Sequence, residues 1–183
     1  THALSSNAQG EAVIHCETEK SGFHAAFAMT SKAVKLKNDS RQPLEATSHG
    51  SNASKAHCAF TTKLDRGEQV VLEKYVGIFS SLQEQKESIA TRAHDSSRKA
   101  GVRGFEQLKA DHTQAWSKIW NRGDIEIKGD VPSQQAIRFN VFHLNQTYRG
   151  DDPRLNIGPK GFTGEKYGGA SYWDTEAYCL PFF

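Results

Sequence analysis

An aromatic pair stands directly beside two acids in the stretch GASYWDTEAY, residues 169–178. Trp173 could support the apolar face of a sugar ring, and Asp174 could accept hydrogen bonds from sugar hydroxyls. Asp174 and Glu176 are two positions apart, so on a helix their side chains diverge and cannot form a paired acid and base. If these residues are functional, the stretch therefore predicts a sugar-binding site rather than a catalytic pair of acids.

A structural role explains the same acid equally well. Ser171 and Asp174 fit the S-x-x-D capping box, which often precedes a helix. The preceding run NIGPKGFTGEKYGG is rich in glycine, and its backbone could approach a ligand closely. Lys160 and Lys166 make that run locally cationic, but it contains neither a Walker motif nor GxGxxG. Both interpretations of Asp174, binding and capping, stay open on the local pattern.

The histidines and cysteines predict no metal site. The eight His are scattered along the chain, and neither HExxH nor CxxC occurs. Cys16, Cys58 and Cys179 lie far apart, and an odd number of cysteines favours reduced thiols and an intracellular, cytoplasmic setting. We expect no metal ion.

Composition argues against two classes of partner. The formal net charge is +2, and the basic residues alternate with acids, which is not the pattern of a nucleic-acid-binding surface. No apolar run reaches the roughly 18 residues that a membrane-spanning helix needs. The first ten residues, THALSSNAQG, lack the charged and apolar regions of a signal peptide. We therefore expect neither nucleic-acid nor membrane partners.

Residues 1–81 are predicted to form strands. EAVIHCE and FHAAFAM are short apolar-rich runs, and QVVLEKYVGIF carries apolar side chains on both faces. A strand that is apolar on both faces predicts cover on both sides, as in a β-sandwich. LDRGE, residues 64–68, is a predicted turn, and the polar region 38–55 is predicted to be a loop.

Residues 82–130 are predicted to be a helical linker. The run SLQEQKESIATRAHDSSRKAG is polar, and it predicts a solvated connecting helix. A second helix follows, because apolar residues recur at helical spacing from Phe105 to Ile119. GDIEIKGD, residues 123–130, is predicted to be extended.

A third helix is predicted to begin at Pro132. Its apolar stripe consists of Ile137, Val141, Leu144 and Tyr148. The flank that carries Arg138 and Phe139 mixes aromatic and polar groups. Such a helix suits the inner layer of a helical barrel, where the polar flank faces a pocket; an amphipathic helix with a broad core face explains the pattern equally well.

The two ends predict a piece of a longer polypeptide. The chain starts at Thr1 and stops at LPFF, within an apolar run. Leu180, Phe182 and Phe183 would then lack packing partners, and burying each such side chain contributes roughly 1.5–3 kcal/mol. The chain alone is expected to aggregate.

QQAIRFNVFHLNQTY, followed by DPRLNIGPKGFTGEKYGGASYWDTEAYCLPFF, resembles the family 65 glycoside phosphorylases, and the maltose-cleaving members most. GEQVVLEKY resembles the last strands of that family's N-terminal β-sandwich. The resemblance implies an α+β multidomain piece. Residues 1–81 would be the C-terminal part of the sandwich, residues 82–130 a helical linker, and residues 131–183 the truncated start of an (α/α)6 catalytic barrel.

The resemblance also implies a reaction, the inverting phosphorolysis of maltose to β-glucose 1-phosphate and glucose. Inorganic phosphate is the co-substrate, and no organic cofactor takes part. Trp173 and Asp174 match the family's WD pair at the donor subsite, and Arg138 and Phe139 would line the same pocket. Glu176 would be a supporting acceptor or a structural residue, not the proton donor. The general acid, a Glu, and the phosphate-binding residues would lie further along the polypeptide, so this chain alone is expected to be inactive. The family suggests a homodimer.

Two kinds of alternative remain. Trehalose or kojibiose phosphorylase, or a trehalose hydrolase on the same fold, would share these motifs. A non-catalytic carbohydrate-binding module with a helical extension belongs to another class, and the strand-rich first half permits it.

Overall fold

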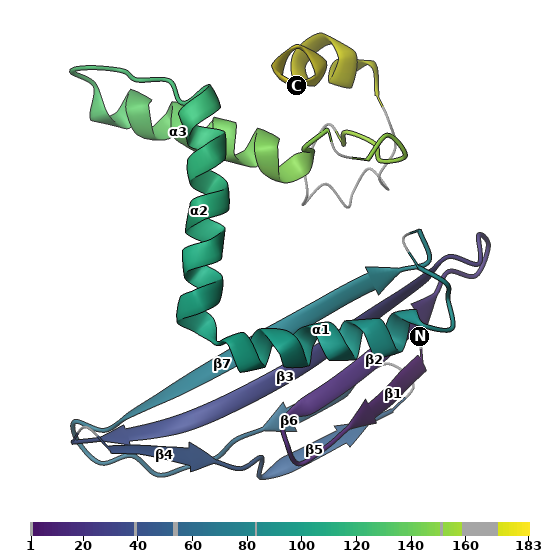
Figure 1. Ribbon diagram of the computed structural model, residues 1–183, viewed down its shortest axis with the longest axis vertical. Coiled ribbons are helices and arrows are strands. Elements are labelled where there is room, and N and C mark those ends of the chain that lie inside the picture. Colours follow the sequence, from purple (N-terminus) through teal and green to yellow (C-terminus); the bar gives the residue numbers. More distant parts are fainter. Residues whose placement is uncertain (1, 39, 53–54, 83, 151, 159–171) are drawn as a thin grey trace. The chain divides into compact units, whose positions relative to one another are not determined.

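The computed structural model describes residues 2–38, 40–52, 55–82, 84–150, 152–158 and 172–183 (Figure 1). They group into two compact units, Thr1–His112 and Thr113–Phe183. The glycine-rich run from 159 onward and Ser171 of the proposed capping box lie outside the described residues. The capping-box interpretation of Ser171 therefore stays a prediction.

The first unit is built around one long central strand, β3 (His24–Lys37). β7 (Gln69–Ser80) pairs antiparallel with almost its whole length, from Ala25 opposite Ser80 to Leu36 opposite Gln69. The opposite edge of β3 is shared by β2 (Glu11–Glu17) and β4 (Ser40–Leu44). β1 (His2–Ser6) pairs with β2 and completes a five-stranded antiparallel sheet.

The apolar strands follow the sequence prediction, whereas the polar ones do not. EAVIHCE, FHAAFAM and QVVLEKYVGIF all lie in strands, and the Glu68 N–H donates to the Asp65 carbonyl in the predicted turn. The loop predicted for residues 38–55 is wrong, because it contains β4 and also β5 (Ser48–Ser51), which forms a hairpin with β6 (Ala56–Ala59). Both strands lie at edges, where polar side chains and a proline such as Pro43 are tolerated.

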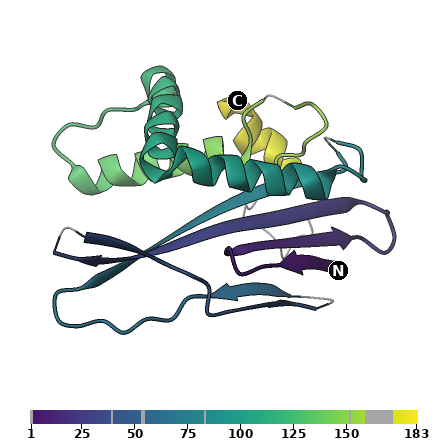
Figure 2. The ribbon, with the colours of Figure 1, turned by 60° about the horizontal axis from the view of Figure 1, so that its bottom comes forward.

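Helix α1 (Ile89–Arg103) covers one face of the sheet, and the expectation of a solvated helix is therefore wrong. Its buried residues follow one another at intervals of four along a single face: Ile89, Ala93, Ser97 and Gly101. They pack against β2, β3 and β7, and Val13, Ala26 and Ala28 complete the buried core (Figure 2). Because three of the four helix residues are small, the apolar content of the segment is low although its inner face is buried.

The helix approaches the sheet closely, and two polar contacts hold it there. A Cβ atom at Gly77 would overlap the Ala93 carbonyl oxygen, so the helix backbone lies almost directly on β7. The hydroxyls of Thr30 and Ser97 are hydrogen-bonded at 2.9 Å. The Lys32 ammonium donates to the Gly101 carbonyl at 2.6 Å, near the other end of the helix.

The opposite face of β3 and β7 is only partly covered by the described residues. The β5–β6 hairpin packs near β1 and β2 on that side (Figure 2). Phe27, Leu72, Val76 and Ile78 are exposed there, with Phe27 directly opposite Ile78 in the register. The prediction that β7 is covered on both faces is therefore wrong for the described chain, which supplies cover from α1 alone along this stretch.

The second unit contains the helices predicted from periodicity. The boundary between the units falls within α2 (Phe105–Gly123). α3 (Val131–Thr147) is capped by Asp130, whose side chain accepts from the Ser133 N–H at 3.1 Å. Val141 of the predicted apolar stripe is buried. A short π-helical turn, Thr175–Cys179, and a 3-10 turn, Leu180–Phe182, follow. Among the described helices, none is long and apolar enough to cross a bilayer. An (α/α)6 barrel stays a prediction.

We expect Gly77→Ala to destabilise the first unit by about 1–3 kcal/mol, because overpacking a tight contact costs energy of that order. The added methyl must displace the helix backbone at Ala93, which cannot move independently of the sheet. The change can be measured as the free energy of unfolding in urea.

Gly123→Ala is the matched control, because a Cβ there meets nothing within 4 Å and the residue ends a helix. It should leave stability unchanged or raise it slightly. Equal stability of Gly77→Ala and the unsubstituted chain would show that α1 does not approach β7 this closely.

Candidate functional site

Trp173 and Asp174 lie on the short segment that leads into the π-helical turn. Trp173 is 74% exposed, and Asp174 is exposed beside it. Asp174 has helical backbone angles at the position just before the turn, and its carboxylate makes no capping hydrogen bond to the turn. The capping box that pairs Asp174 with Ser171 lies outside the described residues, so the capping role stays a prediction.

One hydrogen bond anchors this segment to the residues before the glycine-rich run. The Thr175 hydroxyl donates to the Ile157 carbonyl at 2.9 Å, and Ile157 is itself buried. Glu176 and Tyr178 on the same turn are exposed, Tyr178 at 73%. π-Helical turns are rare and are often found at functional sites, which agrees with a binding role for this segment.

Arg138, predicted to line the sugar pocket, is held in a bidentate ion pair. Its Nε and a terminal nitrogen donate to the two carboxylate oxygens of Asp124 at 2.9 and 2.6 Å. The pairing raises the pKa of Arg138 and lowers the pKa of Asp124 below its usual value. In this arrangement the guanidinium ties α3 to the extended passage after α2.

Gln134, one turn before Arg138, reinforces the same link. Its side-chain oxygen accepts from the Ile127 N–H at 2.6 Å, and its side-chain nitrogen donates to the Ile125 carbonyl at 2.8 Å. Two α3 side chains thus satisfy backbone and carboxylate groups of residues 124–127. The paired residues are seven to fourteen positions apart in sequence, so no local motif predicts these contacts.

Phe139 is largely exposed, and its ring meets His143 edge-on with centroids 4.3 Å apart. It lines an open hollow of about 480 Å³ with Val131, Gln134, Gln135 and Arg138, all of them on α3. Neither Trp173 nor Asp174 lines this hollow. That the two predicted pairs meet in one sugar pocket therefore stays a prediction.

Aromatic packing between α2 and α3 was not predicted from the sequence. Trp116 stacks on Phe142 with centroids 4.7 Å apart and lies beside Trp120 at 5.8 Å. The spacing of the two tryptophans by four residues was the available signal, since such residues share a helix face.

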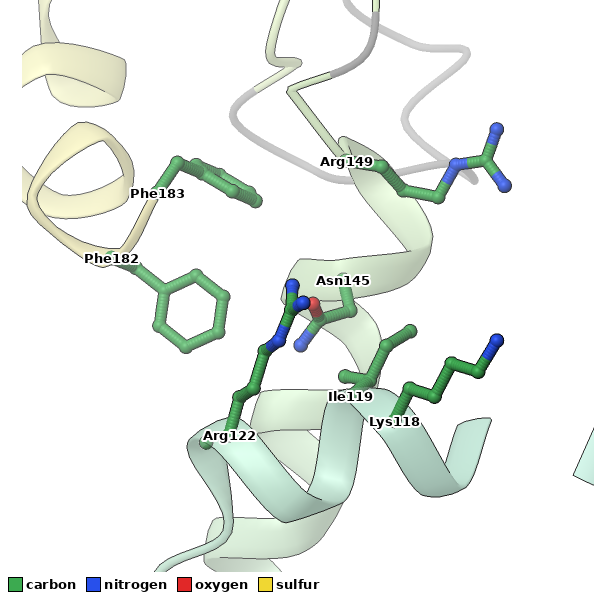
Figure 3. A pocket seen from close by; sticks show the side chains of 8 residues that line it. Lys118, Ile119, Arg122, Asn145, Arg149, Phe182 and Phe183 are labelled. Carbon is green, nitrogen blue, oxygen red and sulfur yellow. The ribbon is translucent and has the colours of Figure 1, made fainter. Parts of the chain in front are cut away.

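A second, larger hollow of about 540 Å³ lies in the same unit (Figure 3). Its lining combines basic, amide and aromatic side chains, and none of the sequence-predicted site residues: Lys118, Ile119, Arg122, Gly123, Asn145, Arg149, Phe182 and Phe183. Sequence reasoning missed it, although Lys118 and Arg122 share one helix face. Within the ranges that the structure describes, no three His, Cys, Asp or Glu side chains are grouped as a metal site would require.

Two family models match the chain. The model described as "Glycosyl hydrolase family 65, N-terminal domain" matches residues 1–119, and the model described as "Glycosyl hydrolase family 65 central catalytic domain" matches residues 138–183. The first match includes the sheet and α1, and the second begins at Arg138 and includes Trp173 and Asp174.

Individual proteins to which the chain is similar include disaccharide phosphorylases. The chain is 50% identical over 112 residues to a maltose phosphorylase of Bacillus subtilis strain 168, a match that covers 61% of this chain and 15% of the relative. It is 36% identical over 121 residues to a kojibiose phosphorylase of Caldanaerobacter subterraneus, covering 66% of this chain and 16% of that one. The solved structure of a candidate kojibiose phosphorylase from the human microbiome aligns with 99% of this chain and 23% of its own, at 25% identity and a TM-score of 0.69.

The chain thus spans only about a sixth of the length of the curated relatives described above. The aligned solved structure, which matches almost the whole of this chain, supports the mixed α and β architecture with a sheet-rich first part.

Asp124→Asn should loosen the extended passage without unfolding the sheet unit, because it removes the carboxylate that Arg138 grips from α3. We expect faster hydrogen exchange at the Ile127 amide, measured by NMR. Acidification should act in the same direction. Since pairing lowers the pKa of Asp124 from 3.8, its stabilising effect is complete above that value and is lost as the pH falls below it.

Gln135→Ala, an exposed neighbour on α3, is the control and should leave the Ile127 amide unchanged. Identical exchange in Asp124→Asn and the unsubstituted chain would show that the ion pair does not order this passage.

Proposed function

The chain belongs to glycosyl hydrolase family 65, and from that membership we propose that it is part of a disaccharide phosphorylase that cleaves maltose. The observation that carries the proposal is the 50% identity over 112 residues with a maltose phosphorylase. Because the chain spans 15% of that relative, the proposed activity is that of a polypeptide that also supplies the remaining segments. On its own, we propose, the chain is inactive.

The proposed reaction is inverting phosphorolysis. A carboxylic acid protonates the oxygen that leaves, and phosphate attacks the anomeric carbon from the opposite face through a state with oxocarbenium character. Phosphate is already an anion, so it needs a cationic or amide-rich surrounding rather than a second carboxylate as base. The products are β-glucose 1-phosphate and glucose, and no organic cofactor is involved.

Within this chain, we assign Trp173 and Asp174 to the glucosyl unit. The exposure of the indole and of the neighbouring carboxylate supports the assignment. Glu176 is proposed as a supporting acceptor. Arg138 is proposed to act indirectly, through its clamp on Asp124, and Phe139 to lie at the edge of the same site. The general acid is proposed to be a Glu further along the polypeptide.

Other substrates are the nearest alternatives. The chain is 36% identical to a kojibiose phosphorylase, 34% to an α,α-trehalose phosphorylase of Thermoanaerobacter brockii and 31% to a nigerose phosphorylase of Lachnoclostridium phytofermentans. These disaccharides share a glucosyl unit, so residues at the donor side cannot discriminate among them. We also propose that the full-length protein is a homodimer in the cytoplasm, with a trehalose hydrolase on the same fold as a further alternative activity.

The proposal is tested on a protein that joins this chain to the remaining segments. Incubation with maltose should release β-glucose 1-phosphate only when phosphate is present, with kojibiose, trehalose and nigerose cleaved more slowly. Glucose release that does not depend on phosphate would identify a hydrolase. Faster cleavage of another disaccharide would overturn the maltose assignment, and sugar binding without cleavage would identify a binding module.

Substitutions in the same protein test the site assignment. Asp174→Asn should lower kcat/KM by about 10- to 100-fold, because a hydrogen bond to a charged group contributes about 1.5–3 kcal/mol. Trp173→Ala should also lower it, through the lost packing of the indole against the sugar. Neither change should lower the melting temperature, since both side chains are exposed.

Tyr178→Ala is the matched control, because this aromatic residue lies on the same turn and is equally exposed. It should retain kcat/KM. A similar loss in Tyr178→Ala and Trp173→Ala would attribute the effect to the turn as a whole rather than to the indole and its carboxylate.

A further inference from the structure

The hollow lined by Lys118, Arg122 and Phe183 has the composition of an anion site with an apolar wall. Its volume of about 540 Å³ is in the range of small-molecule sites. All its lining residues belong to the second unit, and Trp173 and Asp174 are not among them. It is therefore separate from the site assigned to the glucosyl unit.

Three basic side chains and no acid line this hollow. Lys118 and Arg122 are four residues apart on α2, where like charges repel one another. Among the described residues, no ion pair involves either of them. In Figure 3 the Arg122 guanidinium lies beside the Asn145 amide, and Lys118 and Arg149 both extend on the side away from the phenylalanine rings. A bound anion would relieve the repulsion that the two α2 charges exert on each other.

The other side of the hollow is an aromatic corner. The rings of Phe182 and Phe183 are nearly perpendicular, at 86°, with centroids 5.2 Å apart. Tyr148 meets Phe183 edge-on at 5.3 Å and supports it from α3. Two perpendicular rings cannot enclose a flat base between parallel faces, but they can receive the C–H surface of a puckered sugar ring.

We propose that this hollow binds a phosphorylated sugar. The phosphate would lie at the Arg122 guanidinium, with Lys118 and Arg149 adding positive charge at the rim, and the sugar ring against Phe182 and Phe183. A phosphate monoester carries about −1.5 to −2 charge at neutral pH and accepts hydrogen bonds through three oxygens. It therefore matches a group of cations better than a ligand with a single carboxylate would. The Asn145 side-chain nitrogen donates to the Val141 carbonyl at 2.9 Å, which fixes the orientation of the amide beside the Arg122 guanidinium.

The site is defined without reference to phosphorolysis, so it stands or falls separately from the proposed function. Glucose 6-phosphate is the probe, because it combines a phosphate with a hexose ring. Isothermal titration should show saturable binding that weakens as salt is added. Inorganic phosphate should bind more weakly, and glucose should not bind measurably.

The double variant Lys118→Gln, Arg122→Gln should weaken glucose 6-phosphate binding by about tenfold or more, because charge-assisted bonds to phosphate are lost. Phe182→Ala should reduce the preference for glucose 6-phosphate over inorganic phosphate. Lys109→Gln, an exposed lysine on the same helix outside the hollow, is the control and should bind normally. Trp173→Ala should also bind normally, which separates this site from the glucosyl site.

Far-ultraviolet circular dichroism checks that each variant is folded, and Arg122→Lys, which keeps the charge, should bind with intermediate strength. Unchanged binding in the double variant, or equal loss in Lys109→Gln, would overturn the proposal. So would the absence of saturable binding, or tighter binding of adenosine monophosphate than of glucose 6-phosphate.

Discussion

The close contact between α1 and the sheet is the constraint on which the first unit depends. The helix can approach β7 only because Gly77 has no side chain and because Ala93, Ser97 and Gly101 present small groups to it. Protein interiors are close-packed, and where two backbones lie close together even small side chains make many favourable van der Waals contacts. The buried hydroxyls of Thr30 and Ser97 reach each other in this register, while Ser97 also donates to the His94 carbonyl of its own helix. Apolar packing and a buried hydrogen bond therefore select the same position of the helix.

Sequence patterns predicted the parts of this fold in which large apolar residues set the periodicity. The alternation in QVVLEKYVGIF and the stripe through Val141 were sufficient for β7 and α3. The burial of α1 was missed because Ala, Ser and Gly contribute little hydrophobicity, although their spacing of four was present in the sequence. β4 and β5 were missed because edge strands are held by backbone hydrogen bonds, to which polar side chains are no obstacle.

For the candidate site, residue types were predictable, whereas interactions with distant residues were not. Trp173 and Asp174 could be singled out from their neighbours alone. The engagement of Arg138 could not, since Asp124 lies fourteen positions earlier and outside the helix. The cationic hollow is further from any motif, because α2, α3 and the last two residues each contribute to its lining. The spacing of residues along α2 brings together only two of its three basic side chains, Lys118 and Arg122.

The two units hold their functional side chains in different ways. In the first unit, burial against the sheet determines where each inward side chain lies. In the second, exposed or half-exposed hydrogen bonds do so: Thr175 to Ile157, Gln134 to Ile127, and Arg138 to Asp124. The first two are neutral hydrogen bonds, each of which contributes only about 0.5–1.5 kcal/mol net, and the third is an exposed ion pair, which contributes little. A site positioned in this way can be adjusted by a ligand at low energetic cost. Exposed aromatic and charged groups on such a framework are suited to binding polar ring compounds, whose affinity comes from contacts completed on binding rather than from a preformed apolar cavity.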